Sequence, residues 1–99
     1  MGDVLSFLSE FYCSAAANPR IGATHLTLYM AFFQHWSKNG FKNPVEFTSR
    51  DIMPLAKIDS RATYHRCLRD LVECGYIRYV PSCNPFLKSL VYLELSLNN

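Results

Sequence analysis

The chain has 99 residues, of which 49% are hydrophobic and 14% aromatic, and its formal net charge is only +2. This length suits a single domain, and the apolar content excludes an intrinsically disordered chain. It contains no run of about 18 apolar residues, so we expect no membrane partner. The weak net charge does not by itself indicate a nucleic-acid partner.

Residues 3–16 carry apolar side chains at the i, i+3, i+4, i+7 spacing of an amphipathic helix. These are Val4, Phe7, Leu8, Phe11 and Ala15. A helix this short is unstable alone, so it must pack on the rest of the chain or on a partner chain. Asn18-Pro19 interrupts the pattern. We therefore expect residues 1–18 to be a packing or dimerisation helix, and residues 19–99 to form the main domain.

Residues 24–38 predict a second helix that is apolar around most of its circumference. Such a helix is covered on more than one side. The first helix or a second subunit must supply part of that cover. The apolar surplus at Phe7, Phe11, Leu28 and Phe32 marks these four residues as a candidate homodimer interface.

Residues 45–47 predict a short strand, and Thr48–Asp51 fits the capping-box pattern at the start of a short helix ending near Lys57. Pro54 lies inside that helix. Because proline removes a backbone hydrogen bond and clashes with the preceding turn, we expect a kink or a tight 3₁₀ segment there.

Residues 59–75 predict a capped helix with two different faces. At about 100° per residue, Tyr64, Cys67, Leu68 and Leu71 share one face, and Arg66 and Arg69 lie opposite. Ser60 suits the N-cap and Gly75 suits the end of the helix. Basic residues concentrate here: between positions 50 and 69 there are five Lys/Arg against two Asp.

The arginine face has a plainer interpretation as ordinary solvated surface. Asp70 and Glu73 stand four residues after Arg66 and Arg69, and this spacing favours ion pairs on one helix. Such pairs would leave a neutral face. Surface pairs are typically worth less than about 1 kcal/mol, so phosphate can displace them.

Residues 76–80 and 90–95 predict two antiparallel strands, because aromatic, β-branched and alternating apolar residues favour strands. The loop between them carries one basic residue, Lys88. The complete pattern is Ser60-x-x-Thr63-Tyr64-His65-Arg66-x-Leu68-x-x-Leu71-x-x-x-Gly75-Tyr76-Ile77. It resembles the winged helix-turn-helix superfamily over about residues 23–95, and is more closely similar to short winged-helix DNA-binding proteins of bacterial mobile elements and to DnaD-like replication proteins.

The resemblance implies an α+β, mainly helical fold with a three-helix core, a β-hairpin wing and an extra N-terminal amphipathic helix. It also implies a helix that reads the major groove of double-stranded DNA, often in a homodimer. Thr63 and Arg66 match positions that face DNA bases, with Ser60 or Arg61 near phosphate. Arg61 and His65 complete the candidate base contacts. The candidate phosphate contacts are Arg50, Lys57, Ser60, Arg69 and Lys88.

No catalytic or metal-binding pattern is present. His25, His35 and His65 lie on different elements without a matching carboxylate motif, and the four cysteines form no C-x-x-C pair. We expect no enzyme activity, no cofactor and no metal, and free thiols in a reducing cytoplasm. The predicted function is sequence-specific DNA binding, as a transcriptional regulator or a replication or mobile-element accessory factor. The alternative is a winged-helix protein–protein interaction module that does not contact DNA.

Overall fold

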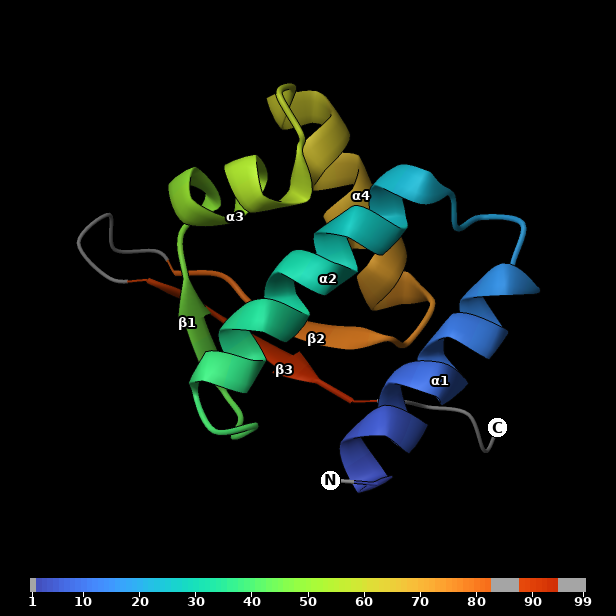
Figure 1. Ribbon diagram of the computed structural model, residues 1–99. Coiled ribbons are helices and arrows are strands. Elements are labelled where there is room, and N and C mark those ends of the chain that lie inside the picture. Colours follow the sequence, from blue (N-terminus) through green and yellow to red (C-terminus); the bar gives the residue numbers. More distant parts are fainter. Residues whose placement is uncertain (1, 83–87, 95–99) are drawn as a thin grey trace.

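A computed structural model describes residues 2–82 and 88–94, with side chains from residue 4 onward. These residues form four helices and one three-stranded antiparallel sheet (Figure 1). The helices are α1 (Gly2–Ala16), α2 (Ala23–Lys38), α3 (Ser49–Ala56) and α4 (Arg61–Glu73), and the strands are β1 (Val45–Phe47), β2 (Ile77–Val80) and β3 (Ser89–Leu93). The predicted α+β class is confirmed. The last strand ends at Leu93, and Leu95 lies outside the described residues.

The sheet places β3 in the centre, because β3 pairs antiparallel with both β1 and β2. Val91 stands opposite Val45 on one side and opposite Tyr79 on the other. Because side chains alternate along a strand, this register gathers one apolar face. The buried residues of that face are Val45, Phe47, Ile77, Val91 and Leu93.

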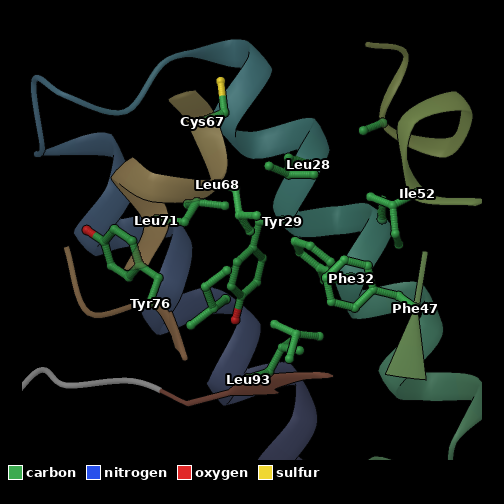
Figure 2. Close-up of a cluster of buried hydrophobic side chains, with 14 of the residues drawn as sticks. Leu28, Tyr29, Phe32, Phe47, Ile52, Cys67, Leu68, Leu71, Tyr76 and Leu93 are labelled. Atoms are coloured by element: carbon green, nitrogen blue, oxygen red, sulfur yellow. The ribbon is translucent and has the colours of Figure 1, made fainter. Parts of the chain in front are cut away.

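Helix α2 is the centre of the molecule and contacts α3, α4, β1 and β3 (Figure 1). Leu28, Tyr29 and Phe32 have no exposed surface. Figure 2 shows Phe32 beside Phe47 of β1, with their ring centres 4.9 Å apart in an edge-on arrangement. The expectation that α2 is covered on more than one side is therefore confirmed.

Helix α1 packs on α2 within the same chain. The ring of Phe11 stacks on that of Tyr29, with centres 3.6 Å apart, and meets the edge of Tyr76 at 5.1 Å. The hydroxyl groups of Ser14 and Tyr76 lie 2.8 Å apart, within hydrogen-bond distance. Phe7 lies against Trp36, with the ring centres 4.9 Å apart. The chain therefore supplies its own cover for this side of α2.

This packing corrects the candidate dimer interface. Phe11, Leu28 and Phe32 are at most 1% exposed within the single chain, and Phe7 is half-buried against α2. An apolar stripe at helical spacing shows that a face is covered, but it does not show by which chain. The exposed apolar side chains of this region are instead Leu5, Tyr12 and Met30.

Helix α3 stays α-helical through Pro54, so of the two expected outcomes, a kink or a 3₁₀ segment, the 3₁₀ segment is not found. Its N-cap forms as predicted, with Thr48 Oγ1 accepting a hydrogen bond from the Asp51 N–H at 3.2 Å. The helix ends at Ala56, and the next residue, Lys57, adopts the left-handed conformation with φ of 60°. Pro54 itself is exposed, so its ring displaces no core side chain.

We predict that Phe11→Ala lowers the free energy of unfolding by about 3–5 kcal/mol, because it removes a buried ring and leaves a cavity between α1 and α2. Tyr12→Ala is the matched control, since Tyr12 is the next residue and is 58% exposed. Urea unfolding followed by circular dichroism measures both variants. Equal losses in the two variants would contradict the packing of α1 on α2.

Candidate nucleic-acid interface

Helices α3 and α4 are joined by a short turn that local residues fix. Ser60 is the N-cap of α4, and its Oγ accepts a hydrogen bond from the Thr63 N–H at 3.2 Å. The guanidinium of Arg61 lies 3.4 Å from Ser49 Oγ and donates a hydrogen bond to it. The first turn of α4 is therefore tied to the first turn of α3.

Helix α4 has the two faces that its sequence predicts. Tyr64, Cys67, Leu68 and Leu71 are buried, as Figure 2 shows for the last three. Desolvation by burial raises the pKa of Tyr64 to about 12 and also raises that of the Cys67 thiol. Both groups are therefore uncharged members of the core at neutral pH.

The opposite side of α4 presents most of the predicted contact residues to solvent. Arg61, His65, Arg66 and Arg69 are exposed, and Thr63 is half-buried. Ser60, Arg50 and Lys57 are also exposed, on the turn and on the neighbouring α3. The fold thus places these candidate contacts on α4, on the turn that precedes it and on α3.

Lys88 is placed elsewhere. It lines a hollow of about 520 Å³ together with Lys38 and His35 of α2 and Glu46 of β1. That hollow contains no residue of α3 or α4. The structure therefore groups Lys88 with the C-terminal end of α2 and not with the arginines of α4.

The ion pairs expected within α4 do not form. Asp70 and Glu73 instead receive Arg20, from the turn between α1 and α2, whose Nη2 donates to Asp70 Oδ1 at 2.6 Å and to Glu73 Oε1 at 2.8 Å. Among the described residues, Arg66 and Arg69 have no ion pair and no hydrogen bond from their side chains. The ion pairs on which the alternative of a neutral arginine face depended are therefore absent here, because Arg20, a residue distant in sequence, binds both carboxylates.

His25 joins the same cluster and was not identified from the sequence. The residue is 6% exposed, and Nε2 lies 2.8 Å from Asp70 Oδ2. The N–H of Gly22 donates to Nδ1 at 3.0 Å. Since Nδ1 accepts a hydrogen bond, we assign the ring proton to Nε2, and this N–H donates a hydrogen bond to Asp70 Oδ2. The one signal in the sequence is position: His25 is the third residue of α2, from where a side chain can reach back to the N-cap.

A second surface feature lies between α1 and α2. It is an apolar hollow of about 490 Å³ whose lining includes Leu5, Leu8, Tyr12, Leu26 and Met30. Leu5 is 70% exposed and Tyr12 58% exposed at its margin. Among the residues whose side chains the structure describes, no charged residue lines this hollow.

Within residues 2–82 and 88–94, no group of three His, Cys, Asp or Glu residues is arranged to hold a metal ion. Cys13, Cys67 and Cys74 are free thiols, and Cys83 lies outside the described residues. No helix in the described part of the chain is long and apolar enough to span a bilayer. Comparison of the chain with models of protein families, with curated sequences and with solved structures finds no similar protein.

We predict that the Asp70 cluster makes stability depend on pH. Hydrogen bonds from His25 and then Arg20 lower the pKa of Asp70. A carboxyl group with a lowered pKa stabilises the fold above its ordinary pKa, near about 4, and loses that contribution as the pH falls through its folded-state pKa. Asp70→Asn should therefore lower the free energy of unfolding by about 1–2 kcal/mol at pH 7, and the two proteins should converge in strong acid.

Urea unfolding at pH 7 and at successively lower pH measures this difference. Asp59→Asn is the control, because Asp59 is exposed and lies outside the cluster. A difference between wild type and Asp70→Asn that stays constant down to pH 2 would show that the charge of Asp70 is not what stabilises the fold.

Proposed function

We propose that this chain binds double-stranded DNA in a sequence-specific manner through the exposed side of α4, as a winged helix-turn-helix protein. The observation that carries the proposal is that Arg66 and Arg69 are exposed, while the nearby carboxylates of Asp70 and Glu73 are paired with Arg20. A basic helix face without internal partners is suited to phosphate and base edges.

The order of elements supports the fold assignment. A winged helix is built as helix, strand, helix, helix and two wing strands, and the order α2, β1, α3, α4, β2 and β3 follows this plan. In the winged-helix plan the short strand adds to the wing sheet, as β1 does here by pairing with β3. In that arrangement α4 takes the place of the helix that enters the major groove.

The roles of individual residues follow from their side chains. The planar guanidinium of Arg66 can donate two hydrogen bonds to O6 and N7 of guanine, with Arg61, Thr63 and His65 as further base contacts. Arg50, Lys57, Ser60 and Arg69 supply phosphate contacts, which position the protein without reading sequence. Lys88, which immediately precedes β3, would contact phosphate from the wing and separately from α4.

A protein of this kind is suited to act as a transcriptional regulator, or as an accessory factor in replication or in a mobile element. These roles share the same binding step and differ in what the bound protein then contacts. The proposal is therefore tested first at the level of duplex binding.

We predict that a mixed-sequence duplex binds the protein at low salt, with an affinity that falls steeply as salt rises. The four basic phosphate contacts, Arg50, Lys57, Arg69 and Lys88, give a slope of log affinity against log salt of about −3.6. Arg66→Glu combined with Arg69→Glu should abolish binding without loss of fold, because both side chains are exposed. Fluorescence anisotropy of a labelled duplex measures this.

The charge-matched control is Lys38→Glu with Lys42→Glu. Both lysines are exposed, and they lie at and just beyond the C-terminal end of α2. This double variant changes the net charge by the same amount away from α4 and at most weakens the single contact from Lys88, which lies beside Lys38, so it should lower affinity far less than the α4 variant. If the α4 variant bound as well as wild type, or if both variants lost binding equally, α4 would not be the DNA-contacting helix.

The apolar hollow between α1 and α2 favours a second candidate function, protein–protein interaction with another copy of this chain. A two-fold interface needs one surface that carries both projections and recesses. Leu5 and Tyr12 project beside the hollow that they help to line, and none of the described residues that line it is charged, so none of these opposes a second copy. This surface replaces Phe11, Leu28 and Phe32 as the proposed homodimer contact.

We predict that wild type has a concentration-dependent mass approaching twice its 11.4 kDa, and that Leu5→Lys is monomeric. Size-exclusion chromatography with light scattering measures the mass. Val80→Lys is the control, because Val80 is 43% exposed on β2 and is not part of the hollow. A wild-type mass of one chain at all concentrations would rule out this interface.

A further inference from the structure

Arg20 forms the longest-range ionic contact in the described part of the chain. It lies in the turn between α1 and α2, and a single nitrogen of its guanidinium donates to Asp70 and Glu73, which are 50 and 53 residues away. His25 approaches the remaining oxygen of Asp70. The carboxylates of the last two turns of α4 are thus directed toward the start of α2.

The turn that carries Arg20 is itself held against the end of α4. The side chain of Asn18 accepts a hydrogen bond from the Arg20 N–H at 2.9 Å. The amide nitrogen of the same side chain lies 3.3 Å from the Cys74 sulfur and 3.4 Å from the Tyr76 hydroxyl. Arg20 is therefore placed opposite the carboxylates by the fold and does not reach them from a free loop.

The alternative partners of these carboxylates are on α4 itself. Asp70 is four residues after Arg66, and Glu73 is four residues after Arg69. Side chains at this spacing are neighbours on a helix and attract when their charges are opposite. Without Arg20, both arginines would have a carboxylate one turn away.

We propose that Arg20 is a positioning residue for DNA binding: by holding Asp70 and Glu73, it leaves Arg66 and Arg69 free for an anionic partner. Arg20 acts through the two carboxylates and does not itself contact the DNA. This inference rests on the proposed function of α4.

Two effects follow from losing Arg20. First, Arg66 and Arg69 would form ion pairs with Asp70 and Glu73, and these pairs would compete with contacts to phosphate or bases. Second, the two carboxylates would no longer be neutralised by Arg20 and would repel the phosphate backbone. Both effects weaken binding. From the strength of two such helix pairs, we expect Arg20→Ala to weaken duplex affinity by about two- to fivefold at low salt, and to make the salt dependence less steep.

The decisive test is a double-mutant cycle. Arg20→Ala is made in wild type and in a protein carrying Asp70→Asn and Glu73→Gln, and duplex binding is measured by anisotropy at several salt concentrations. If Arg20 acts by holding the carboxylates, its removal weakens binding in wild type and has no effect in the second background. An equal loss in both backgrounds would overturn the proposal, because it would mean that Arg20 acts by its own charge or contact.

Two controls make the cycle interpretable. Arg78→Ala removes one exposed arginine from β2, where its partners are Glu94 and the ring of Tyr92, and it measures the effect of losing one positive charge. Arg20→Lys keeps the charge but cannot present the same planar fork, and it should give an intermediate loss. Circular dichroism verifies that each variant is folded; if Arg20→Ala is not, Arg20→Lys takes its place in the cycle.

The outcomes separate this inference from the function on which it rests. If wild type does not bind duplex at low salt, the DNA proposal fails and the role of Arg20 fails with it. If wild type binds and Arg20→Ala binds equally well in the wild-type background, DNA binding stands and only the role of Arg20 is overturned.

Discussion

The structure depends on the burial of α2 by several elements at once. Tyr29 illustrates the constraint: its ring stacks on Phe11 of α1 while its hydroxyl end points toward Leu93 of β3 (Figure 2). Burial raises the pKa of this phenol, which keeps it uncharged. Because α2 contacts α1, α3, α4 and the sheet, it fixes the positions of these elements relative to one another. This packing also determines which side of α4 is exposed.

Much of this arrangement was predictable, because each element carries its own local signals. The caps at Thr48 and Ser60, the strand alternation around Val91 and the two faces of α4 are all properties of a few neighbouring residues. Hydrophobic periodicity reports which face of an element is covered. It does not report which chain supplies the cover, and for this reason the sequence of Phe11 and Phe32 is equally compatible with a dimer, although the chain encloses both residues itself.

The polar contacts of the candidate site were predictable only in part, and the reason is again physical. Arg66, Arg69 and their exposure follow from helical spacing. The partners of Asp70 and Glu73 do not, because Arg20 reaches them only after α1, α2 and α4 have assembled. Spacing along one helix favoured local pairs, and such pairs are weak. A guanidinium held by the fold opposite two carboxylates competes with them successfully. Lys88 shows the same limit, since its position beside Lys38 depends on how β3 is placed against α2.

These contacts connect the core to the surface that the chain presents. His25 is buried at the start of α2 and holds Asp70 by one oxygen, while Arg20 holds the other. Asp70 is therefore fixed from two directions and belongs more to the junction of α2 and α4 than to the exposed side of α4. The charge that α4 displays is thus a property of the assembled domain and not of the helix sequence alone. Counting Arg, Lys, Asp and Glu along α4 gives a nearly balanced helix, whereas the folded chain displays Arg66 and Arg69 without their sequence-adjacent counterions. A basic surface of this kind needs no large net charge, which accounts for a candidate DNA-binding face on a protein whose formal charge is only +2.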